Sequence, residues 1–482
     1  MDWDREKLKD IPAKGGLIDS SDERMESYRE DTMVRGEPDA LMLARDESDV
    51  AEALGFCDAA GIPVTFCASQ TSMTGASVAT EGLLISTEKL EGVESISEGG
   101  DGPVAVVRPG TVCAEFQAAA AEAGFYYPVA PTSRDDCRMG GNIATNATGE
   151  DSYKYGPVRR YVRRLELILP DGTRRTLERK SGCDISLDRN RAGYFTEWQD
   201  PIDLIIGSEG TLAFVAKAEI ALLPGGPPKL FSALIPVRDN QAALDLVISI
   251  ASGEMGLAPR TLELIDTSAL RLMKTAQGFP KIPDDVGAFI YVKQEYANDA
   301  GRDRLLEQWY EKLVPVCGDL IDQLIVGLTR DEQERIRLWR HRIPEAANEW
   351  GRSYWPNGGG KVGSDWWVPM PRLREMMAFF YEAANASGLP YMGYAHIGAG
   401  HPHTNILAKD PREKDIACDV LLACCRKAVE LGGGVAGEHG IGKLHADQLP
   451  IQHDAKTIDT MKKWKREYDP NWILGRGNIF EI

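Results

Sequence analysis

The chain has 482 residues, of which 43% are hydrophobic and 27% are charged. This composition is typical of a globular protein of about two domains, and it excludes a disordered chain or a fibrous repeat. Acidic residues outnumber basic residues by 73 to 55, which gives a formal net charge of −18. Because such a charge repels phosphate groups, neither a nucleic acid nor an anionic membrane is expected as a partner.

The amino terminus and the cysteines indicate a compartment. Residues 1–7 are too charged for a signal peptide, and no apolar run of about 18 residues could span a bilayer. The nine cysteines include no Cys-x-x-Cys pair, so a zinc ribbon or a cubane iron–sulfur cluster has no local ligand set. We expect most of them to be buried, reduced thiols. The sequence predicts a soluble, cytoplasmic protein that contacts a membrane only through a partner.

The predicted elements mix strands with short helices. After a charged peripheral segment, a helix capped by Asp46 or Ser48 and ending at Gly61 is expected. The further elements expected in the first half are strands at 63–66, 83–85, 104–107 and 165–169 and a helix over 111–124. Pro170-Asp171-Gly172 predicts a hairpin turn after the last strand. Because regular βαβ alternation is missing, the predicted class is α+β rather than a doubly wound sheet.

Composition changes at residues 222–228, which contain three prolines and two glycines and predict a domain boundary. The elements expected beyond it are a strand at 230–235 and helices at 240–252, 302–314, 331–350 and 372–387.

Three loops rich in Gly, Ser and Thr lie in the first half, at 63–78, 128–149 and 205–212. Such loops bring backbone amides and hydroxyls close to an anion, because little side-chain bulk separates them from the ligand. Each loop taken singly is typical of an ordinary surface turn.

Together and in this order, the loops resemble the FAD domain of the vanillyl-alcohol-oxidase/p-cresol methylhydroxylase superfamily. More narrowly, they resemble the FAD-linked dehydrogenases of D-lactate, glycolate and D-2-hydroxyglutarate. The match returns at Asp469-Pro470 and covers the chain from about residue 38 to 482. The resemblance implies a two-part FAD-binding domain and an α+β substrate (cap) domain with an antiparallel sheet. The domains implied are a peripheral segment (1–37), the FAD domain (38–225), the cap domain (226–440) and a segment that returns to the FAD domain (441–482).

The resemblance also implies which residues hold the FAD. They are Ala68, Ser69, Gln70, Thr71, Ser72, Gly75, Pro131, Thr132, Gly140, Gly141, Ala144, Thr145, Gly149, Glu209, Gly210, Thr211 and Asn478. Gln70 departs from the family, which has glycine at that position. If the position requires a positive φ, glutamine is strained there by about 1–3 kcal/mol, and FAD retention is weakened.

Three of the seven histidines fall in one stretch, His396 to His403, and Glu438-His439 follows about forty residues later. Imidazoles with a carboxylate are an ordinary ligand set for a divalent metal with an open position. On a continuous strand His396 and His403 would face opposite sides, whereas a bend at 398–400 would bring them together; His401 and His403 already share a face. The spacing therefore leaves the ligands open, and hydrogen-bonded residues in a tight turn are the alternative.

The family motif implies that His396, His403 and Glu438 bind a divalent metal (Zn, Mn or Fe) and that His439 is the catalytic base. His401 stands where the family has asparagine, which adds a candidate ligand. Ala399 stands where the family has aspartate, which removes a hydrogen-bond acceptor near the ligands.

A substrate carboxylate is expected to bind an arginine. The family pattern Trp-x-x-Arg places that arginine on Arg342, whose planar guanidinium can donate two parallel hydrogen bonds to a carboxylate. Lys361 is a weaker candidate, because it lies two residues before the position, Gly363, at which some relatives have a lysine.

The activity implied is oxidation of a 2-hydroxy acid to a 2-oxo acid by FAD. Arg342 and the metal would hold the small carboxylate substrate, His439 would take the hydroxyl proton, and hydride would pass to flavin N5. No nicotinamide fingerprint occurs, so the electrons are expected to pass to an electron-transfer flavoprotein, a quinone-linked iron–sulfur subunit or a cytochrome.

Two rival functions share these features. Gly440 to Leu444 resembles the alkyl-dihydroxyacetonephosphate synthases, which are non-redox flavoenzymes, but those carry a run of histidines where this chain has Glu438-His439. A flavin-binding subunit of a larger electron-transfer complex is the second rival. The sequence leaves the oligomeric state open, a homodimer included.

Overall fold

The computed structural model describes residues 3–180, 189–274 and 281–481, and the chain divides into two compact units. Unit 1 comprises Met1–Gly149, Gly156–Pro227 and Ala436–Ile482. Unit 2 comprises Glu150–Tyr155 and Pro228–Val435.

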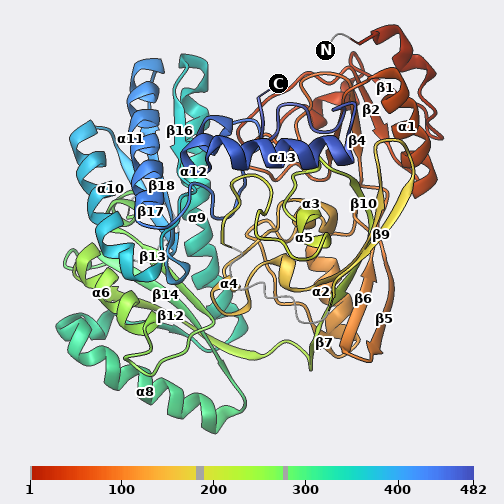
Figure 1. The fold of residues 1–482 in the computed structure, drawn as a ribbon. Coiled ribbons are helices and arrows are strands. Elements are labelled where there is room, and N and C mark those ends of the chain that lie inside the picture. Colours follow the sequence, from red (N-terminus) through yellow and green to blue (C-terminus); the bar gives the residue numbers. More distant parts are fainter. Residues whose placement is uncertain (1–2, 181–188, 275–280, 482) are drawn as a thin grey trace. The chain divides into compact units, whose positions relative to one another are not determined.

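Unit 1 contains two main sheets (Figure 1). In the first, the order is β1-β2-β4-β3; β4 is parallel to both β2 and β3, and β1 is antiparallel to β2. Its strands are β1 (Ile18–Asp19), β2 (Ala40–Leu43), β3 (Val64–Cys67) and β4 (Leu83–Ser86). The second sheet is antiparallel, in the order β5-β6-β10-β8-β9. Its strands are β5 (Val93–Gly99), β6 (Gly102–Val107), β8 (Val162–Ile168), β9 (Arg174–Glu178) and β10 (Phe214–Ala221). A small antiparallel pair joins β7 (Phe125–Tyr126) to β11 (Leu223–Pro224).

The helices of unit 1 begin and end at recognisable residues. Asp46 accepts a hydrogen bond from the Asp49 amide at the start of α1, and Gly61 ends the helix at φ 70°, as predicted. The helices are α1 (Glu47–Ala60), α2 (Cys113–Glu122), α3 (Met139–Ala144), α5 (Ile202–Ile205), α12 (Leu449–Gln452) and α13 (Ala455–Tyr468). The predicted hairpin is confirmed, since β8 pairs with β9 across residues 169–173.

Both ends of the chain are tied into unit 1. Met25 is fully buried, and strand β1 pairs with β2. Near the carboxyl terminus, Leu474 forms a parallel bridge with Val64. Backbone pairing therefore connects segments more than 400 residues apart in the sequence.

Unit 2 is built on one antiparallel sheet of seven strands in the order β15-β12-β14-β13-β17-β18-β16, which confirms the predicted antiparallel sheet. The strands are β12 (Lys229–Val237), β13 (Thr261–Ile265), β14 (Ala288–Tyr296), β15 (Ile325–Gly327), β16 (Gly360–Gly363), β17 (Tyr391–His396) and β18 (His401–Ala408).

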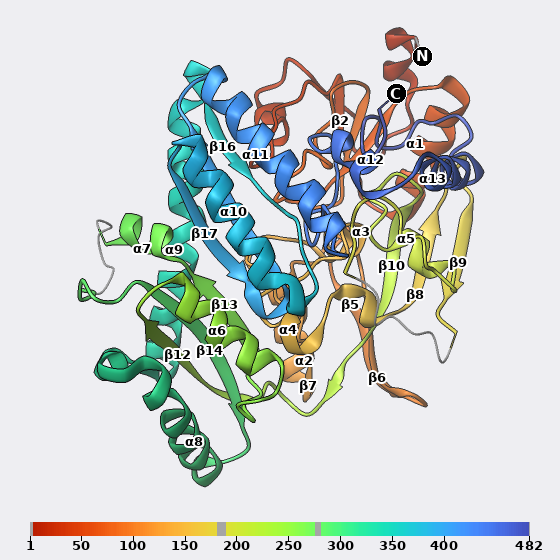
Figure 2. The same ribbon diagram turned by 60° about the vertical axis from the view of Figure 1, so that its left-hand side comes forward.

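Helices cover this sheet, and α10 and α11 lie side by side (Figure 2). The helices of unit 2 are α4 (Ser152–Tyr155), α6 (Asn240–Ala251), α7 (Thr267–Met273), α8 (Asp299–Cys317), α9 (Arg330–Tyr354), α10 (Leu373–Ser387) and α11 (Pro411–Glu430). The four predicted helices are confirmed as α6, α8, α9 and α10. Helix α9 packs against β12, β15, β16 and β18, and it begins with a capping box between Thr329 and Glu332.

Seven of the eight described cysteines are buried and all eight are free thiols, as predicted; Cys183 lies outside the described residues. In the part of the chain that the structure describes, no helix is both long and apolar enough to cross a membrane.

Candidate flavin and metal sites

The first predicted flavin loop follows β3 in unit 1. Gln70 has φ 49°, so the residue that replaces the family glycine does occupy the left-handed region in which only glycine is unstrained. Its side-chain amide donates a hydrogen bond of 2.6 Å to the carbonyl of Tyr28. Asp31 accepts a hydrogen bond of 2.8 Å from the Gly75 amide. The amino-terminal segment thus holds this loop in place and offsets the strain.

The second flavin loop needs its glycines for close packing. A Cβ at Gly149 would lie 1.9 Å from the carbonyl oxygen of Ala130, and one at Gly140 would lie 2.7 Å from Cβ of Pro109.

The hydroxyls of Ser77 in the first loop and Thr148 in the second loop are buried and have no hydrogen-bond partner among the described residues. Since a buried hydroxyl without a partner is costly, these loops fit a polar ligand such as FAD.

The third loop is tied to the carboxy-terminal segment through Glu209. This buried carboxylate accepts hydrogen bonds from the amides of Ile441 (2.8 Å) and Gly442 (2.6 Å). Asn478 donates to the carbonyls of Ala76 (2.8 Å) and Glu209 (3.3 Å). The first loop, the third loop and the carboxy-terminal segment therefore meet within unit 1.

Lys443 is a further polar residue of this part of unit 1 and was not among the predicted site residues. Its ammonium group donates to Asn478 Oδ1 at 2.6 Å, and burial lowers its pKa to about 8. The sequence signal for Lys443 as a candidate site residue is its position directly after Gly442, in a glycine-rich motif.

The raised pKa of buried Glu209 should make the stability of the protein depend on pH. Burial raises its pKa to about 7 in the folded protein, although the Ile441 and Gly442 amides oppose the shift. The folded state therefore binds a proton more tightly than the unfolded state, so the stabilisation is present below about pH 4.5 and is lost as the pH rises through 7. Between pH 4.5 and 8 we expect the unfolding free energy of the wild type to fall by about 3 kcal/mol relative to Glu209→Gln, measured by urea unfolding. Parallel profiles for the two proteins would contradict this assignment.

The three clustered histidines of unit 2 lie on one face of the β17–β18 hairpin. Residues 397–400 form a tight turn, and the register pairs His396 with His401 and Tyr394 with His403. Directly paired residues point to the same side of a sheet, and so do residues two apart on one strand. His396, His401 and His403 therefore share one face, although His396 and His403 are an odd number of residues apart. The ring centres lie 5.2 Å apart for His396 and His403, and 4.5 Å apart for His401 and His403.

Two of these imidazoles contact buried carboxylates. Oε1 of Glu263, on β13, lies 2.6 Å from His396 Nδ1, and Oδ1 of Asp365 lies 3.0 Å from His401 Nε2. Glu263 also accepts a hydrogen bond from the buried guanidinium of Arg340, on α9. A carboxylate at one ring nitrogen fixes the tautomer and the orientation of the imidazole. A ring nitrogen of His396 and one of His403 lie within 4.8 Å of each other, so this pair fits a divalent metal.

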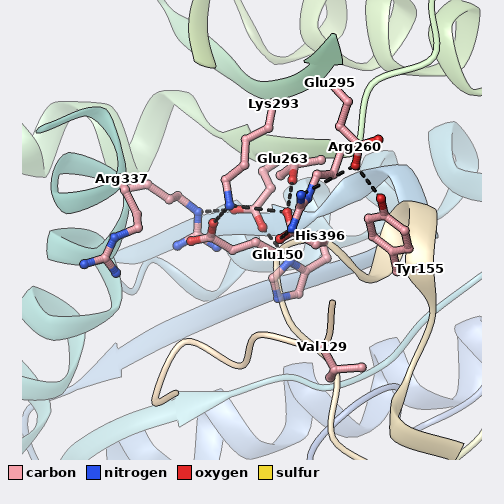
Figure 3. Close-up of polar contacts among 12 residues, drawn as sticks. Val129, Glu150, Tyr155, Arg260, Glu263, Lys293, Glu295, Arg337 and His396 are labelled. Carbon is pink, nitrogen blue, oxygen red and sulfur yellow. Dashed lines mark hydrogen bonds and ion pairs between the residues drawn. The ribbon is translucent and has the colours of Figure 1, made fainter. Parts of the chain in front are cut away.

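A second cluster of buried charges lies beside Glu263 in unit 2 (Figure 3). Glu150 contacts both Lys293 and His341, and Asp151 pairs with Arg260. Burial alone would raise the pKa of Glu150, but Lys293 and His341 hold it well below its usual value. The carboxylates also hold the pKa of Lys293 well above its usual value despite burial. The charges are thus balanced inside the unit. Glu263, Arg340 and Glu150 carry no local sequence signal of a site, because their partners are distant in the sequence.

Arg342, the predicted carboxylate clamp, is not among the buried residues of α9. Its guanidinium is half-exposed on α9 and pairs with Glu345 (3.1 Å) and Glu349 (3.2 Å). Residues of a helix are about 100° apart, so Arg342 projects about 200° away from the buried Arg340. The Trp-x-x-Arg pattern therefore falls on Arg342, the exposed arginine of α9, and not on the buried Arg340.

Lys361 is buried on β16 and pairs in register with Leu407 of β18, which places it on the sheet face of His403. Its ammonium group donates to Asn348 Oδ1 at 2.6 Å. Burial, and secondarily the charge of Arg352, lowers its pKa to about 8. Glu438 and His439 belong to unit 1, and their implied roles rest on the sequence motif.

Comparisons with known proteins agree with this architecture. Residues 38–178 match the FAD binding domain, and residues 227–479 match the C-terminal domain of FAD linked oxidases. The chain therefore belongs to the FAD-linked oxidases and is an oxidoreductase with a two-part FAD-binding domain.

Individual proteins are similar over nearly their whole length. The chain is 28% identical to the glycolate oxidase subunit GlcD of Bacillus subtilis, over 99% of this chain and 96% of that one. It is 26% identical to a D-lactate dehydrogenase of Anaerostipes hadrus, over 98% and 96%. A 4-ethylphenol oxidase from Gulosibacter chungangensis has the same fold, with a TM-score of 0.71 at 16% identity over 99% and 96%.

Proposed function

We propose that this protein is an FAD-dependent dehydrogenase that oxidises a 2-hydroxy acid to the 2-oxo acid. The observation that carries the proposal is the imidazole pair of His396 and His403 on one sheet face, with Glu263 bound to His396 Nδ1. Membership of the FAD-linked oxidases, and relatives named for glycolate and D-lactate, support the reaction class and a small carboxylate substrate.

Different residues would bind the metal, accept the substrate proton and hold the FAD. His396, His403 and, by its motif, Glu438 would hold the divalent metal, which supplies Lewis acidity toward the substrate hydroxyl. His439 would accept the hydroxyl proton, since an imidazole titrates near neutral pH. FAD, held by the three loops of unit 1, supplies the hydride acceptor.

Lys361 is a better candidate than Arg342 for the substrate carboxylate. Its buried ammonium group lies on the sheet face of His403, whereas Arg342 is already paired with two glutamates at the surface. Electrons would then leave for an electron-transfer flavoprotein, an iron–sulfur subunit or a cytochrome.

An anaerobic titration tests the proposal. The purified flavoprotein is mixed with glycolate, both enantiomers of lactate and both enantiomers of 2-hydroxyglutarate, and the visible flavin absorption is recorded. We expect at least one of these acids to bleach the flavin band and to yield its 2-oxo acid in equal amount. A flavin band that none of the acids bleaches would contradict the proposal and favour a non-redox flavoenzyme or a relay subunit.

A further inference from the structure

Cys113 and Cys137 lie directly opposite each other in unit 1. Val112 and Arg138 form an isolated antiparallel bridge, so the next residues along the two segments are also opposite one another. The Cys113 amide donates a hydrogen bond of 2.9 Å to the Cys137 carbonyl. Opposite residues of an antiparallel pair have Cα atoms about 4.5–5.5 Å apart, and disulfides join Cα atoms about 4.4–6.8 Å apart. The backbone therefore holds the two cysteines at a separation that a disulfide can span.

The two thiols interact, and they differ in acidity and in exposure. Both are free, Cys113 is fully buried, and Cys137 is 4% exposed and directly follows the exposed residues Asp135 and Asp136. Hydrogen bonding between the thiols lowers the pKa of Cys137 and raises the pKa of Cys113. Cys137 is therefore the more acidic thiol of the pair and the one nearer to solvent.

Other described cysteines lack this environment. Burial raises the pKa of Cys57, Cys67 and Cys424 to about 12, so these thiols stay protonated near neutral pH. The thiolate is the nucleophile in the reaction of a cysteine with a peroxide. Cys137, whose pKa is lowered, is therefore a better nucleophile than these three residues.

We propose that Cys113 and Cys137 are a redox-active dithiol, which a hydroperoxide such as hydrogen peroxide converts to a disulfide. The sulfur of Cys137 attacks one peroxide oxygen, the O–O bond breaks, and the departing hydroxide takes the thiol proton to become water. The sulfur of Cys113 then attacks the resulting sulfenic acid, the S–S bond forms, and a second water leaves. The two thiols lose two electrons and two protons in all, and the peroxide is reduced to two waters.

The disulfide would fasten the second flavin loop, residues 128–149, to α2. Cys137 belongs to that loop, and Cys113 is the first residue of α2. Arg138, next to Cys137, donates a hydrogen bond of 3.1 Å to the Ser69 hydroxyl in the first flavin loop. Because a cross-link restricts the opening of the chain that it closes, we expect FAD to leave the oxidised protein about 3-fold more slowly, or slower still.

The test is peptide mapping of the FAD-loaded protein after treatment with hydrogen peroxide, with the remaining thiols alkylated under denaturing conditions. Trypsin cleaves after Arg134, which lies between the two cysteines, so the disulfide joins two separate peptides. We expect one disulfide, between Cys113 and Cys137, which dithiothreitol reverses. The fluorescence of released flavin measures FAD release from the oxidised and the reduced protein.

Single variants assign the two roles. In Cys113→Ala the sulfenic acid of Cys137 should persist and react with dimedone, whereas in Cys137→Ala the thiol of Cys113 should stay unlabelled. Cys57→Ala is the matched control, because it removes a buried thiol of α1 in the same unit, and it should form the disulfide as the wild type does. Unaltered FAD content and circular dichroism before oxidation establish that each variant is folded.

Two results would overturn the inference. One is a peroxide-treated wild type in which Cys113 and Cys137 are both still alkylated; the other is oxidation of the partly exposed Cys418 as fast as that of Cys137. Equal rates of FAD release from the oxidised and the reduced protein would refute the effect on the flavin loop. None of these results depends on bleaching of the flavin by a 2-hydroxy acid, which tests the proposed function separately.

Discussion

Replacing His439 with alanine is expected to slow reduction of FAD by the 2-hydroxy acid by roughly 10²–10⁴-fold, the range that a positioned general base contributes. The flavin loops of unit 1 do not require this side chain, so FAD should remain bound at wild-type stoichiometry. Stopped-flow absorbance under anaerobic conditions measures the reduction step directly, and the protein-bound flavin is quantified in the same samples.

His445→Ala is the matched control for this experiment. His445 lies six residues further along unit 1, and its Nδ1 contacts Gln448 at 3.0 Å. We expect its rate of flavin reduction to stay within a few-fold of the wild type. Equal rates for His439→Ala and the wild type would show that another group takes the proton.

Replacing Arg340 with methionine is expected to lower the free energy of unfolding of unit 2 by about 3–5 kcal/mol. Arg340 and Glu263 are both buried and form an ion pair, so removing the guanidinium leaves a buried carboxylate without that partner. Urea unfolding monitored by circular dichroism gives the change in stability. The loss should be smaller in the double variant with Glu263→Gln, because the uncompensated charge is then removed as well.

Arg342→Met on the same helix is the control, because it makes the same chemical change at the surface. Exposed ion pairs contribute little to stability, so this variant should unfold at nearly the wild-type urea concentration. If both arginine variants lost the same stability, the Arg340–Glu263 pair would have no special role in unit 2.

Local sequence signals predicted many elements of the fold. Asp46 and Gly61 mark the two ends of α1 because capping depends on residues within one turn of the helix end. Pro170-Asp171-Gly172 marks the β8–β9 turn for a similar reason. Gln70 also has the positive φ that the sequence analysis named as the condition for strain, a condition that concerns a single residue and its backbone.

The histidine motif was predicted only in part. The sequence showed that a bend at residues 398–400 would place His396 and His403 on the same side, and the structure has that bend. It could not show that Glu263 contacts His396, a residue 133 positions away. Nor could it show which arginine of α9 faces the sheet, since Arg340 and Arg342 have the same chemistry and nearly the same neighbours.

The sequence by itself therefore determined the α+β class, the helix ends, the glycine-rich loops and the histidine motif, because each depends on short-range geometry or on residue type. Only the tertiary structure decided that Arg340 is buried while Arg342 is exposed, and that Glu263 and Asp365 lie against the imidazoles. The physical reason is that strand register and helix rotation are set by packing between distant segments. These two features determine which charged side chains meet in a buried site.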